Sequence, residues 1–184
     1  MALTKTPICN FGEKAKNFNL ISTENKKLSL KDVTGEKGTL IMFICNHCPY
    51  VKAVIRDLVD DVKFLESLGI KSVGIMSNDV KNYPDDSFEN MISFSKSNGF
   101  TFPYLIDETQ NVAKEYGAVC TPDFFGYNKN LELQYRGRIR ELKDLKPVRK
   151  GDSDLKVAMK LVAETGNGPK NQIPSMGCNI KWFK

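Results

Sequence analysis

The sequence predicts a single α/β domain built on a central mixed sheet flanked by helices. An apolar run over residues 39–44 is typical of a buried strand, and residues 51–65 then repeat apolar side chains at helical spacing. A second apolar run over 70–76 follows, and strand–helix–strand in this order predicts two parallel strands joined by a right-handed crossover. Short apolar stretches before and after this unit predict antiparallel strands, so we expect a mixed sheet.

The N-terminal part is expected to form a hairpin. Residues 18–20 and 28–30 alternate apolar and polar side chains, and turn-prone residues 22–25 join them. The helix that follows the 39–44 strand is expected to end at Gly69, because glycine is common just past a helix C-terminus.

The second half of the chain predicts alternating short helices and strands. The expected elements are a proline-containing loop at 82–86, a helix from Phe88 to Gly99, a strand at 104–107, a helix at 112–117, an antiparallel hairpin from 124–127 and 131–139, and a last helix capped by Ser153 and ending at Gly166. All 184 residues are expected to form one domain, with residues 1–10 and 167–184 as irregular ends.

Two cysteines lie where the 39–44 strand passes into the first helix. Cys45-Asn46-His47-Cys48 is followed by Pro49, which suits the first helical turn because it lacks a backbone N–H. The positive end of a helix favours thiolate over thiol, so we expect Cys45 to be a nucleophile and Cys48 to displace a mixed disulfide. His47 is expected to lower the pKa of Cys45 further by adding positive charge.

This strand, Cys-X-X-Cys pair and helix resemble the thioredoxin superfamily. The continuation through Tyr50, Val51, Lys52 and Ala53 is similar to the redoxin branch grouped with the alkyl hydroperoxide reductase/thiol-specific antioxidant (AhpC/TSA) proteins. The resemblance covers roughly residues 11–182 and implies a thioredoxin-like fold. The interval between the cysteine pair and Pro122 is longer than in compact thioredoxins, so residues 78–106 are interpreted as a helix–strand insertion.

Thr121-Pro122 is the second motif of the resemblance. Only about 5% of X-Pro bonds in folded proteins are cis, but the resemblance implies a cis bond here, opposite the cysteine pair. The backbone beside such a proline can pair with an extended peptide or thiol substrate, so Thr121, Pro122 and the nearby Cys120 are expected to bind substrate.

The other cysteines and a run of arginines have plainer interpretations. Cys120 and Cys178 could join Cys45 and Cys48 in a four-thiolate zinc shell or a thiol relay, but small buried apolar residues are the favoured interpretation. The alternating arginines are interpreted as a solvated edge strand: Arg136, Arg138 and Arg140.

Composition excludes several classes of function. The net charge of +5 is concentrated in the last third of the chain, but no aromatic residues interleave with the basic ones, which argues against nucleic-acid binding. No apolar run approaches the ~20 residues that span a bilayer. The first residues lack a signal-peptide pattern, so a cytoplasmic location is expected, where cysteines serve catalysis more than structural disulfides.

These observations predict a thiol–disulfide oxidoreductase that reduces or exchanges substrate disulfides. Its expected partners are a disulfide-containing protein or small-molecule thiol substrate and an upstream thiol reductant, with no cofactor or metal. A peroxiredoxin-type thiol peroxidase is an open alternative. In the Pro-X-X-X-Thr-X-X-Cys pattern of that family Cys48 would be peroxidatic, although Ile41 replaces the proline and Cys45 the threonine. A metal-binding or redox-sensing module is the non-enzyme alternative.

Overall fold

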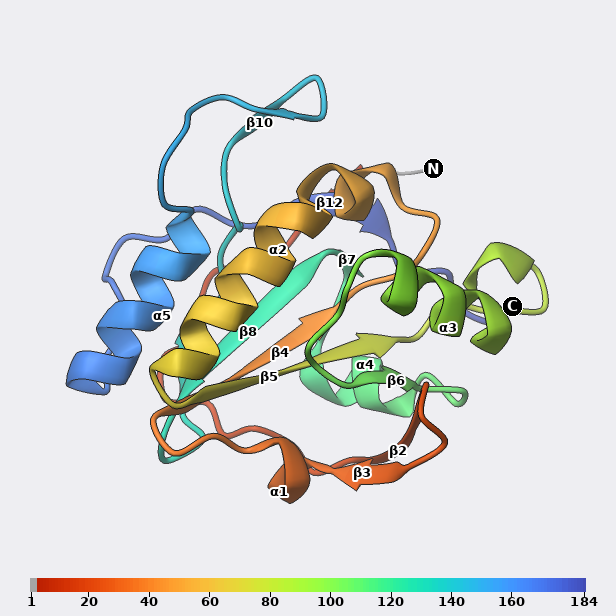
Figure 1. Cartoon of the computed structure of the whole chain (residues 1–184), viewed down its shortest axis with the longest axis horizontal. Helices are drawn as coiled ribbons and strands as arrows, with labels where there is room; N and C mark the ends of the chain where they lie inside the picture. The colour runs from red at the N-terminus through yellow and green to blue at the C-terminus, as the bar shows by residue number, and fades with distance from the viewer. Residues whose placement is uncertain (1–2) are drawn as a thin grey trace.

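The computed structural model describes residues 3–184 and contains a seven-stranded mixed sheet (Figure 1). In spatial order its strands are β3 (Lys27–Ser29), β2 (Asn19–Ser22), β6 (Tyr104–Ile106), β5 (Ile70–Met76), β4 (Gly38–Phe43), β8 (Asp123–Asn128) and β9 (Leu133–Tyr135). Strands β4, β5 and β6 are parallel, and the other pairings are antiparallel. The predicted mixed sheet and N-terminal hairpin are therefore confirmed.

Helices cover both faces of this sheet. One face carries α2 (Pro49–Ser67), α3 (Phe88–Ser97) and α5 (Asp154–Thr165), and the other carries α1 (Leu30–Val33) and α4 (Asn111–Tyr116). Strand β4 supplies both cores, because Leu40 and Met42 pack toward α2 while Ile41 and Phe43 pack toward α4. A strand buried on both faces reads as a continuous apolar run, which is the pattern seen in the sequence.

Helix α2 carries the cysteine pair at its N-terminus. Cys48 is its N-cap residue and Pro49 its first residue. Its buried stripe begins at Val51 and continues to Leu65, and burying each such side chain contributes about 1.5–3 kcal/mol. Gly69, at φ +85, follows its end as predicted. Within residues 3–184, no helix combines the length and the apolar character needed to cross a membrane.

A second, three-stranded sheet lies at the end of the molecule that holds the cysteines. Its order is β1 (Leu3–Lys5), β12 (Met176–Asn179) and β7 (Cys120–Thr121), all antiparallel. The prediction that both chain ends are irregular is therefore wrong at these strands. Strand β12 has no alternating pattern, since its sequence is Met-Gly-Cys-Asn, and it forms because distant β7 and β1 pair with it.

The predicted arginine-bearing edge strand is also corrected. Strand β9 ends at Tyr135, and the arginines lie beyond it, before a small hairpin of β10 (Leu142–Lys143) and β11 (Lys146–Pro147). Each arginine has a carboxylate partner on another element: Arg136 with Asp123 at 3.0 Å, Arg138 with Asp154 at 2.7 Å, and Arg140 with Asp57 at 2.9 Å. Their charges therefore form ion pairs within the fold and are not solvated at the edge of a sheet.

The helix–strand insertion is present between β5 and the Thr121-Pro122 segment. It begins with a short 3-10 helix, η1 (Pro84–Asp86), and continues through α3 to β6. Its first part returns to the N-terminus of α2, so the insertion contributes directly to the surroundings of the cysteine pair.

Candidate active site

The two cysteines lie together at the carboxyl end of the central strand. Cys45 lies two residues beyond the end of β4, and Cys48 caps α2. Their side chains are hydrogen-bonded to each other, and the residues are 1% and 0% exposed. The structure thus places the predicted redox pair at the predicted strand-to-helix turn, but with both sulfurs shielded from solvent.

Thr121 contacts both sulfurs from the opposite side. The Thr121-Pro122 bond is cis, as the resemblance implied. The Thr121 hydroxyl lies 3.3 Å from Cys45 Sγ, and the Cys48 thiol donates to the Thr121 carbonyl oxygen over 3.2 Å. The residue before the proline therefore holds the cysteine pair in place.

The pKa values of the two thiols are shifted in opposite directions. The hydrogen bond with Cys48, burial and the charge of Asp86 raise the pKa of Cys45. The hydrogen bond from Cys45 lowers the pKa of Cys48 to about 4, and the Val51 N–H in the first turn of α2 acts in the same direction. These shifts favour the thiolate on Cys48, whereas the hydrogen bond from Cys48 to the Thr121 carbonyl oxygen needs a proton there. The two thiols therefore titrate as a pair, and the expectation that Cys45 is the attacking thiol stays a prediction.

Thr121 also accommodates the opposite proton arrangement. When the proton is on Cys48, the Cys48 thiol donates a hydrogen bond to the Thr121 carbonyl oxygen, and the Thr121 hydroxyl can donate a hydrogen bond to the Cys45 thiolate. A proton can thus pass between the sulfurs without rearrangement of their neighbours, and the titration belongs to the pair.

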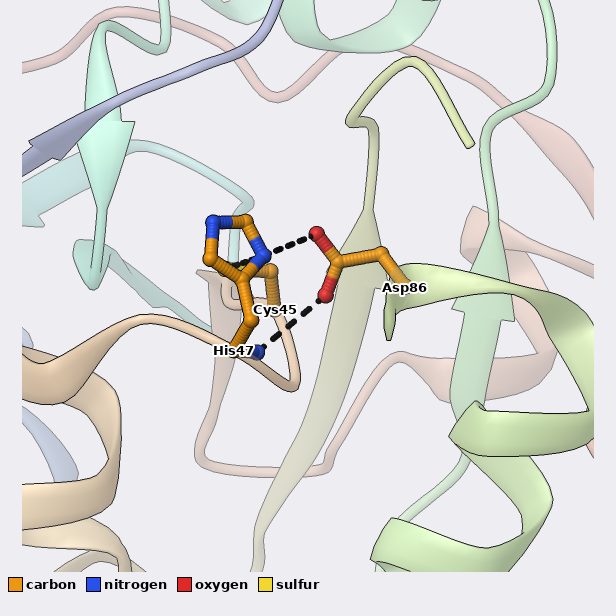
Figure 2. A group of neighbouring side chains, drawn as sticks. All are labelled: Cys45, His47 and Asp86. Carbon is orange, nitrogen blue, oxygen red and sulfur yellow. Dashed lines mark hydrogen bonds and ion pairs between the residues drawn. The ribbon is translucent and has the colours of Figure 1, made fainter. Parts of the chain in front are cut away.

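His47 forms a buried ion pair with Asp86 (Figure 2). Its Nδ1 lies 2.6 Å from Asp86 Oδ2 and 4.0 Å from Cys45 Sγ. The hydrogen bond to Asp86 raises the pKa of His47, so the imidazole stays cationic to higher pH than usual. The carboxylate balances that cation and itself raises the pKa of Cys45, so the predicted lowering of the Cys45 pKa by His47 is not what the structure shows.

Asp86 also fixes the backbone between the cysteines. It is 0% exposed and accepts hydrogen bonds from the backbone N–H groups of Asn46 (2.8 Å) and His47 (3.3 Å) and from the Asn78 amide (2.8 Å). Although burial alone would raise it, the bonds from His47 and Asn78 hold the pKa of Asp86 below its usual value. The buried Tyr104 hydroxyl donates a hydrogen bond to the Asn46 side chain over 2.9 Å, which also helps to hold the turn between the cysteines.

The sequence analysis missed these supporting residues. Asn78 could have been found, because it follows β5, and the carboxyl ends of the parallel strands β4 and β5 lie side by side. Asp86 and Tyr104 gave no local signal, since their role depends on how the insertion folds back.

The expected substrate edge beside the proline is covered by the protein's own strand. Strand β12 pairs with β7, with Cys178 opposite Thr121. Cys120 is 0% exposed, and its thiol points at the Pro122 carbonyl oxygen. The C-terminal strand thus fills the position beside β7 in this structure, and the binding of substrate by Thr121, Pro122 and Cys120 stays a prediction.

The potential metal ligands are grouped differently from the four-thiolate shell that was the minor alternative. Within residues 3–184, the one group of at least three such residues whose donor atoms all lie within 4.8 Å of one another is Cys45, His47 and Asp86. Tetrahedral zinc with bonds of about 2.0–2.2 Å keeps its ligand atoms roughly 3.3 Å apart. The 2.6 Å contact between His47 and Asp86 is a hydrogen bond, so this arrangement forms an ion pair rather than a metal shell.

A buried dithiol at a helix start, in contact with the residue before a cis-proline at the end of a mixed sheet, is typical of a thioredoxin-like redox protein. The fold agrees with that of the thioredoxin domain of a thiol-disulfide oxidoreductase from Bacteroides vulgatus, with a TM-score of 0.58 at 16% identity over 68% of this chain and 86% of that one. The sequence profile of the AhpC/TSA family matches residues 11–142, and the chain belongs to this family.

Several relatives are similar over more of the chain or carry informative names. An uncharacterized conserved protein from Geobacillus kaustophilus has a TM-score of 0.94 and 38% identity, covering 100% of this chain and 97% of that one. The thiol-disulfide oxidoreductase ResA of Bacillus thuringiensis is 29% identical over 69% of each chain. A Mycobacterium tuberculosis protein named "Putative peroxiredoxin" is 26% identical over 67% of this chain and 74% of its own length. Together these similarities support a redox enzyme in general.

Proposed function

We propose that the protein is a thiol–disulfide oxidoreductase whose redox centre is Cys45 and Cys48. The observation that carries the proposal is the buried pair of cysteine sulfurs, each in contact with one polar atom of Thr121. Similarity to the ResA protein supports disulfide chemistry.

The reaction begins with a proton transfer inside the pair. Cys45 passes its proton to Cys48, and its thiolate attacks one sulfur of the substrate disulfide, forming a Cys45–substrate bond as the substrate S–S bond breaks. The departing substrate thiolate takes up a proton from solvent. Cys48 then loses its proton and attacks Cys45, which forms the Cys45–Cys48 disulfide and releases the second substrate thiol. An upstream thiol reductant returns two electrons to the pair.

Substrate access requires a local opening of the turn between the cysteines. Among its four residues, His47 is the one that is not fully buried, and its ring stacks on Tyr83 with centroids 5.9 Å apart. We expect movement of this stacked pair to uncover the turn. A small thiol or a flexible protein segment fits such an opening better than a rigid surface.

A thiol peroxidase is the second candidate, and the lowered pKa of Cys48 favours it. Peroxidases of this family attack a hydroperoxide with a thiolate near a helix N-terminus, and Cys48 has that position and a lowered pKa. Attack on hydrogen peroxide would give a Cys48 sulfenic acid and water, and Cys45 would condense with it to a disulfide and a second water.

Two turnover assays on the same purified protein separate these functions. The first follows disulfide reduction coupled to a thiol reductant, and the second follows hydrogen peroxide consumption. We expect disulfide turnover in the wild type, loss of it in Cys45→Ser and Cys48→Ser, and unchanged turnover in the control Cys9→Ser. Peroxide turnover that survives Cys45→Ser with an added thiol but not Cys48→Ser would select the peroxidase. Oxidation of the pair without turnover in either assay would favour the redox sensor.

The expected partners and the cytoplasmic location stay predictions. The disulfide-bearing substrate and the upstream reductant are identified here only by their chemistry, as partners that exchange two electrons with a dithiol.

A further inference from the structure

Strand β12 occupies the position beside β7 that an extended substrate would take. It runs antiparallel to β7, with Cys178 opposite Thr121, the residue that contacts both active-site sulfurs. The chain therefore presents one of its own cysteines at the place where a substrate sulfur is expected.

This placement is held by close and specific contacts. A Cβ atom at Gly177 would lie 2.0 Å from the Thr121 carbonyl oxygen, so only glycine permits the strands to approach this closely. The Ser175 hydroxyl donates to the Pro122 carbonyl oxygen over 2.8 Å. The two contacts flank Cys178 on one side and fix its distance from the cysteine pair.

Cys178 lies in the same buried cluster as the redox pair. The core cluster that contains Cys45 and Cys48 also contains Cys178, and the neighbouring Cys48 contributes to the raised pKa of Cys178. Cys178 is 4% exposed, so external oxidants reach it less easily than its neighbour inside the protein does. Three cysteine thiols of the chain are thus gathered in this cluster.

We propose that Cys178 is a third redox-active thiol, which exchanges with the Cys45–Cys48 disulfide to form a Cys48–Cys178 disulfide. This inference rests on the proposed oxidoreductase function. Cys178 loses its proton and attacks Cys48, so that the Cys48–Cys178 bond forms, the Cys45–Cys48 bond breaks, and Cys45 leaves as a thiolate that takes up the proton. No electrons enter or leave the protein in this step.

The oxidation state of Cys48 controls the step. Burial and the neighbouring Cys48 raise the pKa of Cys178 to about 12 while the pair is reduced, so Cys178 is then a proton donor and not a nucleophile. Forming the Cys45–Cys48 disulfide removes the negative charge from Cys48. The part of the shift that this charge causes disappears, and the Cys178 thiolate becomes easier to form.

Exchange would give Cys45 a second use. After one substrate disulfide has been reduced, the exchange moves the internal disulfide from Cys45–Cys48 to Cys48–Cys178. Cys45 is then free to bind a second substrate sulfur. The chain would then carry an internal disulfide and a mixed disulfide on Cys45 together, which a two-cysteine centre cannot do.

Disulfide mapping after reaction with excess oxidised glutathione tests the exchange. The wild type, Cys178→Ser and the control Cys9→Ser are each reacted, alkylated and analysed by intact and peptide mass spectrometry. We expect the wild type and the control to contain a Cys48–Cys178 disulfide with one glutathione on Cys45. We expect Cys178→Ser to contain only the Cys45–Cys48 disulfide and no such doubly oxidised species.

The outcomes separate this inference from the proposed function. A Cys45–Cys48 disulfide in the wild type, with Cys178 fully alkylated, overturns the exchange and leaves the oxidoreductase intact. If no internal disulfide forms, both fail. As a second measurement, oxidised Cys45→Ser should contain the Cys48–Cys178 disulfide, and a Cys48–Cys120 disulfide there would contradict the role given to Cys178.

Discussion

Replacing Asp86 with asparagine tests how the turn between the cysteines is held. Asp86→Asn keeps the shape but removes the charge that pairs with His47 and one of the oxygens that accept hydrogen bonds. Asp86 is fully buried, and the His47 side chain is 14% exposed, so the pair is largely shielded from solvent. Breaking a buried ion pair costs about 3–5 kcal/mol, and the partial exposure of His47 places the expected loss near the lower end.

The pH dependence of this loss follows from the two pKa values. The pKa of His47 is raised above 6.5, so its contribution is fully present below pH 6.5 and is lost as pH rises through the raised value. The pKa of Asp86 is lowered below 3.8, so its contribution is present above pH 3.8 and is lost as pH falls through the lowered value. The stability difference between wild type and Asp86→Asn should therefore be largest between these limits.

Urea denaturation at several pH values and NMR titration of His47, the only histidine, provide the assay. The variant should bring the pKa of His47 back toward 6.5 and lower that of Cys45, because the Asp86 charge raises both. Asp85→Asn is the matched control, since only its backbone carbonyl bonds to the turn. A stability difference independent of pH, together with an unchanged His47 titration, would refute the reasoning.

Three further substitutions and one control test other contacts of the fold and site. Arg136→Leu leaves a buried carboxylate unpaired and should cost about 3–5 kcal/mol in urea denaturation, whereas Lys26→Ala, at an exposed pair, should change little; equal effects would contradict this. Thr121→Val removes a hydroxyl that lowers the pKa of both active-site thiols, so the midpoint of alkylation rate against pH should move upward, and a downward shift would be inconsistent with the assigned contact. Gly177→Ala should force β12 away from β7 at a cost of about 1–3 kcal/mol and speed alkylation of Cys178; unchanged protection of that thiol would argue against the close approach.

The central part of the fold could be predicted because its signals are local. The apolar run before Cys45 and the helical repeat after it specify a buried strand and an amphipathic helix, and the structure has both with nearly the same bounds. Gly69 and Ser153 mark helix ends for conformational reasons that act within a few residues.

The parts that could not be predicted depend on contacts between distant segments. Strand β12 is specified by pairing with β7 more than fifty residues earlier, and its Met-Gly-Cys-Asn sequence has no strand pattern. The Arg136 side chain looked like a surface charge because its partner Asp123 is identified only when β8 and β9 pair. Pairing across the sheet thus decided where these residues lie.

The candidate site divides in the same way. The cysteine pair and Thr121-Pro122 could be found by motif, because their chemistry depends on residue types at short spacing. The directions of the two thiol pKa shifts could not, because they depend on the surroundings: Cys48 caps the helix, and the N–H groups of the turn bind Asp86 instead of Cys45.

Trapping the first covalent intermediate tests the central claim most directly. Cys48→Ser and Cys45→Ser are each mixed with a small disulfide substrate, and the adduct is located by peptide mass spectrometry. The account predicts a stable mixed disulfide on Cys45 in Cys48→Ser, because the thiol that would resolve it is missing. A substrate adduct on Cys48 in Cys45→Ser, with none on Cys45 in the companion variant, would contradict the assignment of Cys45 as the attacking sulfur.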